Sequence, residues 1–317
     1  MLQLPLRRLD LFCTVVDEGG VTRAAERLHV AQPWVSAQLR SLEKAVAAPL
    51  FVRDGRRLAL TEAGRRLYAW ATEVLAGGAQ VQRDIEHLSS GTAGSLIVAT
   101  SMAIGTYLVP PLLTELRKER AGADITVRIS EPAAALRSVE IGEVDFAVAT
   151  WSDEIDHGAL HAEKLWEESL VLACAPDGPP HADAIDLAEI AELPVVGVPA
   201  GVAFDHMLTH QLRRHGVDRV PYVIRLGHAE AMKRAVAAND WVCLAPRYVV
   251  ADDVAADRLR AVEIRDARLV EGIGLFHRAA KYFSPLQEAA VATLREISVA
   301  RAIGAAAPVP PVAPSDG

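Results

Sequence analysis

The chain has 317 residues, of which 51% are hydrophobic and 23% are charged. This length predicts at least two compact units, and this composition excludes a disordered chain. The net charge of −8 argues against a protein that binds polyanions over its whole surface. The three cysteines lack a Cys-x-x-Cys pair, which excludes a disulfide scaffold and a zinc ribbon and suits a reducing compartment.

Charge is distributed unevenly along the chain. Residues 20–66 contain nine basic and four acidic residues, so this segment carries +5 and the rest of the chain carries −13. A basic module on an acidic body is typical of a protein with one end that faces nucleic acid. An arginine-rich solvated surface is the alternative, and charge alone does not separate the two.

Three short helices are predicted at the start of the chain. Apolar residues from Leu6 to Val16 recur at helical spacing, and Gly19-Gly20 ends that helix. We expect Thr22 to cap a second helix over Arg23–Leu28. After a three-residue break, Gln32-Pro33 opens a third. This arrangement is a helix-turn-helix, whose third helix enters the major groove of DNA.

The third helix has a polar face suited to that role. Gln32, Ser36 and Arg40 are spaced at i, i+4 and i+8. The first two can reach base edges and the third can reach a phosphate, and Pro33 starts the helix beside them. Trp34 either stacks on a sugar or a thymine methyl group, or packs against the neighbouring helix.

A basic hairpin follows. Asp54-Gly55 separates two short apolar runs, which is typical of a tight hairpin turn. Arg53, Arg56 and Arg57 on this wing are expected to reach the DNA backbone or minor groove. A solvated hairpin tip is the alternative for at least one of them.

A long helix is predicted from Glu62 to about Ser89, with Thr61 as its cap. Two interleaved seven-residue repeats predict a seam that pairs two chains, although a helix buried on its own body is the alternative. The repeats consist of Leu67, Val74, Val81 and Leu88, and of Ala71, Gly78 and Ile85.

The remaining chain alternates strands and helices, which predicts parallel sheets with crossover helices, in two α/β lobes with a cleft between them. The expected strands are 95–100, 125–129, 144–149, 170–173, 195–198, 222–226, 241–245 and 270–277; the expected helices are 107–119, 132–141, 204–215, 229–238 and 285–302.

Several stretches resemble the LysR-type transcriptional regulators. They are AAERLHVAQPWVSAQLRSLE (24–43), PLFVR (49–53) and LTEAG (60–64). Less specific similarities follow at 94–98, 142–148, 230–238 and 244–246, so the resemblance covers about residues 6–300. Trp34 departs from the family, which usually has a small residue there.

The resemblance implies a winged helix-turn-helix, a linker helix and a two-lobed α/β effector domain similar to periplasmic binding proteins. The expected divisions are 1–60 for DNA binding, 61–90 for the linker and dimerisation helix, and 94–302 for effector binding. Lobe I takes about 94–165 and 267–302, lobe II about 166–266, and 303–317 form an Ala/Pro-rich disordered tail.

The effector is expected beyond the carboxyl ends of the strands and near helix N-termini. The hydroxyls of Thr100 and Ser101 match the position that the family uses for effectors, although simple helix capping is the alternative. The loop at 199–204 is Ser/Thr-rich in the family and apolar here, so we hypothesise an organic acid that also carries an apolar part. The candidate residues are Thr100, Ser101, Met102, Thr150, Trp151, Gly201, Val202, Phe204 and His228.

The expected function is regulation of transcription by a cytoplasmic protein that binds double-stranded DNA as a homodimer or homotetramer, with RNA polymerase as a further candidate partner. The N-terminus does not have the pattern of a secretion signal, and no membrane span is predicted. The alternatives are a small-molecule binding protein without a DNA role, and redox sensing through Cys174 and Cys243. The identity of the effector, the promoter and the sign of regulation stay open.

Enzymatic and metal chemistry find little support. No nucleophile elbow, phosphate loop or dinucleotide fingerprint appears, so we expect neither an enzyme nor a bound cofactor. His206 and His210 share a helix face, but a solvated face explains them better than a metal site does.

Overall fold

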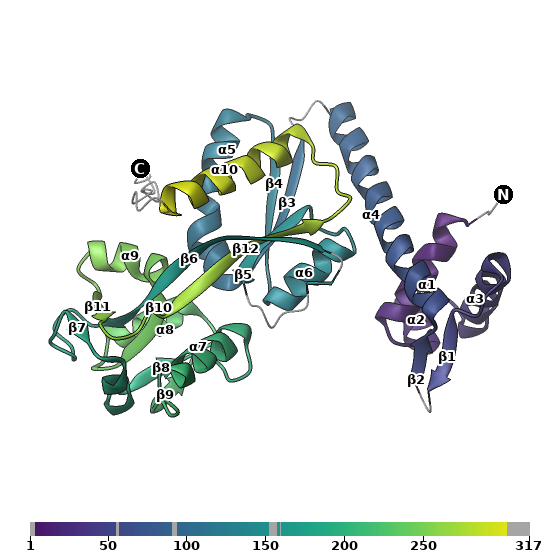
Figure 1. The fold of residues 1–317 in the computed structure, drawn as a ribbon. Coiled ribbons are helices and arrows are strands. Elements are labelled where there is room, and N and C mark those ends of the chain that lie inside the picture. Colours follow the sequence, from purple (N-terminus) through teal and green to yellow (C-terminus); the bar gives the residue numbers. More distant parts are fainter. Residues whose placement is uncertain (1–3, 55–56, 91–93, 152–156, 159, 303–317) are drawn as a thin grey trace.

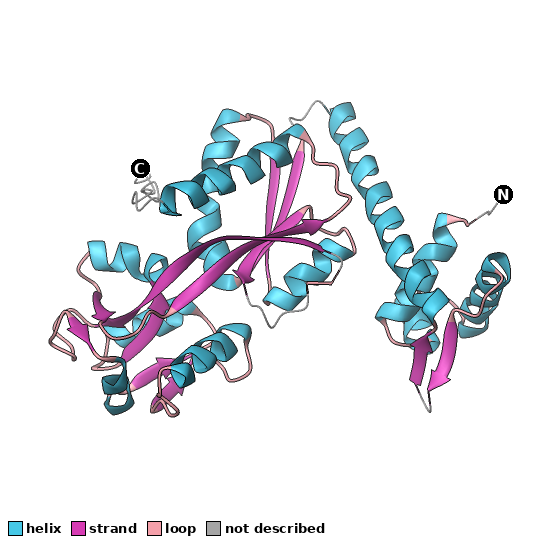
Figure 2. Ribbon diagram, viewed as in Figure 1, coloured by secondary structure: helices cyan, strands magenta, loops and turns pink. Residues whose placement is uncertain are grey.

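The computed structural model describes residues 4–54, 57–90, 94–151, 157–158 and 160–302. Figure 1 shows a helical N-terminal module and a larger α/β body, with one long helix between them. Strands run through the centre of the body and helices flank them (Figure 2).

Three helices and a hairpin form the N-terminal module. Leu9, Phe12, Val35 and Leu42 are completely buried and hold the helices together. The second helix has Gly20 as its N-cap, so the expected cap at Thr22 is wrong by two residues. The elements are α1 (Leu6–Asp17), α2 (Val21–Arg27), α3 (Gln32–Val46), β1 (Phe51–Asp54) and β2 (Arg57–Leu60).

The long helix α4 (Glu62–Ser90) begins as expected. The amide of Gly64 donates a hydrogen bond to Thr61 Oγ1 (2.9 Å), which confirms Thr61 as the cap. The first half of α4 packs on the N-terminal module, and α4 also contacts the body.

Two long antiparallel strands, β6 (Leu160–Cys174) and β12 (Val270–Arg278), run through the whole body and join its lobes. The main sheet has the strand order β4 (Asp124–Ile129), β3 (Ser95–Thr100), β5 (Phe146–Trp151), β12, β6, β10 (Val242–Pro246), β8 (Val195–Gly197) and β9 (Tyr222–Arg225). Lobe I contains β3 (Ser95–Thr100), the π-helical turn η1 (Ile104–Leu108), α5 (Val109–Glu119), β4 (Asp124–Ile129), α6 (Pro132–Glu140), β5 (Phe146–Trp151) and α10 (Pro285–Ala302).

Lobe II contains the strands that pair with the other half of β6. Parallel strands alternate with helices here as well, and a second apolar core lies between them. Its elements are β7 (Ala184–Ile185), the short helix η2 (Leu187–Glu192), β8 (Val195–Gly197), α7 (Ala203–Arg214), β9 (Tyr222–Arg225), α8 (Ala229–Ala237), β10 (Val242–Pro246), α9 (Arg247–Ala255) and β11 (Arg260–Ile264).

The structure corrects two predictions in the body. The strand expected over 170–173 begins ten residues earlier, because the polar residues from His161 to Glu168 also lie in β6. The elements β7, η2, α9 and β11 were not expected. The expected disordered tail, 303–317, lies outside the described residues.

Candidate functional site

The polar face of α3 is open to solvent. Gln32, Pro33 and Arg40 are exposed and Ser36 is half-buried, whereas Val35 is fully buried on the opposite side. Helix α3 ends before Ala47, whose backbone is left-handed (φ 53°). Because Val35 faces the core and the predicted contact residues face away from it, these residues share one accessible surface.

Trp34 stands on this surface rather than in the core of the module. Its side chain is 48% exposed, so the structure does not favour packing against the neighbouring helix. The expected hairpin forms between β1 and β2, and Asp54 pairs with Arg57 beside the turn. Arg56 and the side chains of Arg53 and Arg57 lie outside the described part of the chain.

The seam predicted along α4 is not a continuous free surface. Leu67, Ala71 and Val74 belong to the core of the chain's own N-terminal module, and Ala71 is fully buried there. Val81 and Ile85 in the second half remain exposed. The first half of the expected pairing surface is therefore wrong, since apolar heptad positions serve an internal core as well as a dimer.

A cavity of about 250 Å³ lies between the two lobes. Lobe I contributes the end of β3 and the start of α6, and lobe II contributes the ends of β8 and β10 and the starts of α7 and α8. Most of its walls are apolar. They include Met102, Pro132, Val198, Met232 and Val249.

Six of the nine predicted effector residues line the cavity: Ser101, Met102, Thr150, Val202, Phe204 and His228. The other three do not. Thr100 is buried and donates a hydrogen bond to the carbonyl of Ser101 (2.7 Å). Trp151 stacks on Phe276 with 5.7 Å between ring centroids, and Gly201 is exposed.

A buried carboxylate that the sequence analysis missed lies at the cavity. Glu271 on β12 is 2% exposed and accepts hydrogen bonds from Thr150 Oγ1 (2.7 Å) and from Tyr248 Oη (2.8 Å). Thr150 lies in lobe I and Tyr248 in lobe II, so Glu271 connects the lobes. Burial raises the pKa of Glu271, although both hydrogen bonds oppose the rise. A single acid inside the apolar run 270–276 was the signal available in the sequence.

Lys233 on α8 is a buried cation that lines the cavity, and two carboxylates of lobe II balance its charge. Its Nζ lies 2.6 Å from both Glu230 Oε1 and Asp253 Oδ2. Burial lowers the pKa of Lys233, but these hydrogen bonds outweigh burial and raise it overall. Tyr107 from lobe I donates a hydrogen bond to Glu230 (2.5 Å), which makes a second link between the lobes.

The cysteines have the surroundings of inert thiols. Cys13, Cys174 and Cys243 are all buried, and burial raises the pKa of Cys243 to about 12. Burial also raises the pKa of Cys174. A reactive thiol needs the opposite shift, so these surroundings disfavour redox sensing.

Metal-binding clusters and membrane-spanning helices are both absent from the described residues. No group of three or more His, Cys, Asp or Glu side chains in them is arranged to hold a metal ion. No helix among them is both long enough and apolar enough to cross a membrane.

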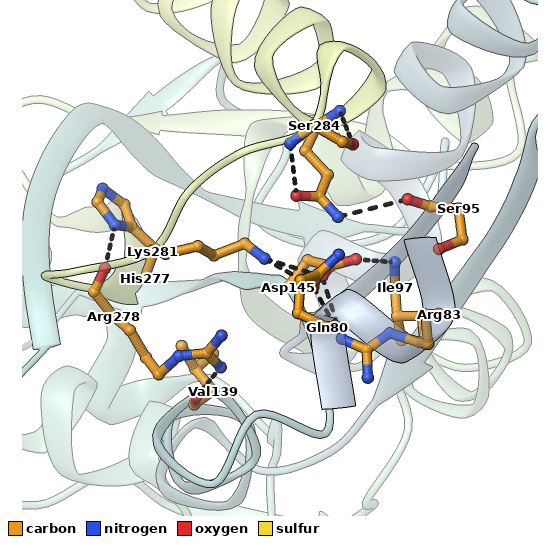
Figure 3. A network of polar contacts seen from close by, with 11 residues as sticks. Gln80, Arg83, Ser95, Ile97, Val139, Asp145, His277, Arg278, Lys281 and Ser284 are labelled. Carbon is orange, nitrogen blue, oxygen red and sulfur yellow. Dashed lines mark hydrogen bonds and ion pairs between the residues drawn. The ribbon is translucent and has the colours of Figure 1, made fainter. Parts of the chain in front are cut away.

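A buried polar network joins α4 to lobe I (Figure 3). Asp145 is fully buried, and its Oδ2 accepts a hydrogen bond from the Ile97 amide (2.8 Å). Its Oδ1 lies 3.0 Å from Lys281 Nζ and 3.6 Å from Arg83 Nη2. On α4, Gln80 Oε1 accepts from both Lys281 (3.0 Å) and Arg83 (2.8 Å).

A second contact joins lobe I to the N-terminal module. Arg137 on α6 donates to Asp17 on α1 and to the Tyr68 hydroxyl on α4, and Tyr68 itself donates to Asp17 (2.6 Å). Gly142 packs so closely on α4 that an added Cβ would lie 2.3 Å from the Cβ of Ala76.

Two family models match the chain. One, described as a bacterial regulatory helix-turn-helix protein of the lysR family, matches residues 6–65. The other, described as a LysR substrate binding domain, matches residues 89–298. Together they cover the N-terminal module and the body.

Similar proteins agree with these matches. A probable RuBisCO transcriptional regulator from Cyanidioschyzon merolae is 30% identical over 270 residues, which are 83% of this chain and 89% of the relative. The transcriptional activator IlvY of Salmonella typhimurium is 26% identical and covers 90% of this chain and 98% of its own length.

Solved structures have the same fold. A full-length OxyR variant from Pseudomonas aeruginosa matches with a TM-score of 0.61 and 20% identity, over 94% of this chain and 95% of its own. Full-length CbnR in complex with its target DNA matches with a TM-score of 0.56 and 20% identity, over 92% and 99%. The chain belongs to the LysR family of DNA-binding transcriptional regulators with an effector-binding domain.

Proposed function

We propose that the exposed face of α3 reads the bases of a regulatory DNA site, and that a small molecule between the lobes controls this binding. Gln32, Ser36 and Trp34 contact bases or sugars, and Arg40 holds a phosphate. Arg53, Arg56 and Arg57 on the wing contact the flanking DNA. The observation that carries this proposal is the solvent-open polar face of α3 in a net positive module.

Selection from a pool of random duplexes tests the proposal without a known promoter. The full chain is expected to enrich a motif with two half-sites, because two copies present two copies of α3. Recovery of duplexes with no shared motif contradicts sequence-specific reading.

The effector is proposed to be a small organic molecule with a large apolar part. The cavity exceeds the roughly 150 Å³ cavity that accepts benzene. The acidic group expected from the sequence has a donor in His228, whose Nδ1 accepts from the Glu230 amide and thus leaves the proton on Nε2. Lys233 is already paired with two carboxylates. No cofactor is proposed.

Effector binding is proposed to shift the relative placement of the two lobes. The effector must bind one arrangement more tightly than the other for such a shift. Lobe I transmits the change to α4 through Asp145 and Lys281, which contact Gln80 and Arg83. Variants of Gln80 or Arg83 are expected to bind effector normally while responding less in DNA binding.

The active form is proposed to be a homodimer or homotetramer. The exposed apolar side chains of Trp70, Val81 and Ile85 on α4 support a pairing surface along this helix. Light scattering on a size-exclusion column tests this: Val81→Lys with Ile85→Lys is expected to give smaller particles than the unmodified chain. An unchanged particle mass would mean that Val81 and Ile85 do not lie in the interface between subunits.

The remaining assignments follow from membership of a family of regulators. We propose that the chain has no enzymatic activity and acts in the cytoplasm on double-stranded DNA, with RNA polymerase as a further partner. A pull-down of RNA polymerase on a promoter fragment, with and without the chain, tests the last of these.

A further inference from the structure

Ser101, Thr150 and Glu271 line the cavity and contact one another, and we call this group its floor. Thr150 and Tyr248 each donate their single hydroxyl proton to Glu271. Ser101 Oγ lies 3.3 Å from Thr150 Oγ1, and since the Thr150 proton points to the carboxylate, Ser101 must be the donor of that pair. Ser101 and Thr150 therefore offer a ligand in the cavity acceptor lone pairs and no free donor.

Among the described residues, Glu271 also has no basic side chain as an ion-pair partner. Within the described ranges no Lys, Arg or His side chain forms an ion pair with it, and no cation is among the groups that shift its pKa. Its partners are two neutral hydroxyls. A buried carboxylate in an apolar cavity is unfavourable unless a positive charge or further hydrogen bonds compensate it.

The cavity itself does not supply that charge. Lys233 is held by Glu230 and Asp253 at 2.6 Å each, so its charge is already balanced. The other walls beside Glu271 are mainly apolar. An ionised Glu271 is therefore stabilised by a positive charge on a molecule that enters the cavity.

We propose that Glu271 recognises a protonated amine on the effector, so that the effector of this chain is an ammonium compound with an apolar body. The inference rests on the proposed effector site and names the class of molecule that the site takes. The ammonium group donates to the free lone pairs of Glu271 and of the Ser101 and Thr150 hydroxyls, while the apolar body contacts Met102, Val202 and Phe204.

This assignment differs from the acid group expected from the sequence and is compatible with it. An acid group at Glu271 would bring two like charges together in a medium of low polarity. The acid group, where present, lies toward His228, and the amine lies at the floor. An effector with both groups satisfies both sites.

Isothermal titration calorimetry with the full-length chain tests the proposal. The probes share one phenyl body and differ only in the terminal group: phenethylamine, phenylethanol and hydrocinnamate. The amine is expected to bind at least about tenfold more tightly than the alcohol, the usual effect of a charge-assisted hydrogen bond, and hydrocinnamate is expected to bind more weakly than the amine.

Two variants test whether the preference for the amine depends on the charge of Glu271. Glu271→Gln keeps the shape and removes the charge, so the preference for the amine over the alcohol should vanish. Glu131→Gln removes an exposed carboxylate that also lines the cavity, and it should keep the preference. If a variant fails to fold, the preference of the unmodified chain for the amine over the alcohol still tests the proposal.

The other outcomes separate this inference from the effector site. Binding of the alcohol or the acid at least as tightly as the amine overturns the role of Glu271 and leaves the cavity as an effector site. Retention of the amine preference in Glu271→Gln also overturns it. If none of the three probes binds at millimolar concentration, both the amine assignment and the proposed cavity are rejected.

Discussion

Lys281 Nζ lies 3.0 Å from Asp145 Oδ1, and both side chains are almost completely buried where the effector-binding body meets α4. The two residues are 136 positions apart in the chain. Burial lowers the pKa of Lys281, although the charge of Asp145 opposes the shift. The pair therefore depends on both partners, because either charge alone would be buried without its nearest opposite charge.

Removing one partner is expected to destabilise the body strongly. Lys281→Met leaves Asp145 with the Ile97 amide and with Arg83 at 3.6 Å, and breaking a buried pair in this way costs about 3–5 kcal/mol. The double variant Asp145→Asn with Lys281→Met should lose less, since no charge is left unpaired. Urea unfolding of the full chain measures the differences.

An exposed pair of the same type serves as control. Lys118 lies 2.8 Å from Glu115 on the surface of α5, and Lys118→Met should cost less than about 1 kcal/mol. Similar losses for the two lysine variants would refute the special role of the buried pair.

A second prediction concerns the close packing of Gly142 on Ala76. Gly142→Ala adds a Cβ at 2.3 Å from that of Ala76, at a position whose φ is +76°. The left-handed backbone alone costs about 1–2 kcal/mol for a residue with a Cβ, and overpacking adds about 1–3 kcal/mol.

Gly216→Ala separates these two effects. Gly216 has a similar φ of +84°, and no atom lies within 4 Å of an added Cβ. Chemical denaturation should therefore give a smaller loss for Gly216→Ala than for Gly142→Ala. Equal losses would mean that contact with α4 contributes nothing.

A third prediction follows from the raised pKa of Glu271. A carboxyl whose folded pKa lies above its usual value contributes stability below the usual pKa, near 4.5, and this contribution is lost as pH rises through the folded value. The neutral variant Glu271→Gln does not ionise. Without effector, its melting temperature should exceed that of the unmodified chain at pH 8, by about 2–4 °C for each kcal/mol gained.

The same difference should shrink as the pH falls through the folded pKa, because protonation removes the charge of the unmodified carboxyl. Thermal scans of both proteins from pH 5 to pH 8 measure it. Parallel curves over this range would show that Glu271 does not change its charge there.

Local patterns predicted the parts of the site that lie on one element. The face of α3 follows from helical periodicity, because Gln32, Ser36 and Arg40 lie one turn apart whatever surrounds them. The cavity residues Ser101 and Thr150 follow from a general property of parallel sheets, whose carboxyl ends meet at one edge.

Long-range pairings explain what was missed. Nothing near Asp145 in the sequence indicates Lys281, and Glu271 acquires its role only when β12 brings it beside Thr150 and Tyr248. Ala71 was placed in the wrong interface because an apolar heptad does not distinguish an internal partner from a second chain.

The last prediction concerns DNA binding by Arg40, which is exposed on α3. Arg40→Ala removes one phosphate contact, so affinity should fall for specific and random duplexes alike, and the slope of log affinity against log salt should decrease by about 0.9. Fluorescence anisotropy at several salt concentrations measures both quantities. Arg117→Ala removes another exposed charge from α5 in the effector-binding body, far along the chain from the helix-turn-helix, and should change neither quantity. A loss of affinity confined to one DNA sequence would instead assign Arg40 to base reading. Equal effects of the two variants would indicate a general response to net charge. In that case the experiment would not distinguish a DNA-facing module from an arginine-rich solvated surface.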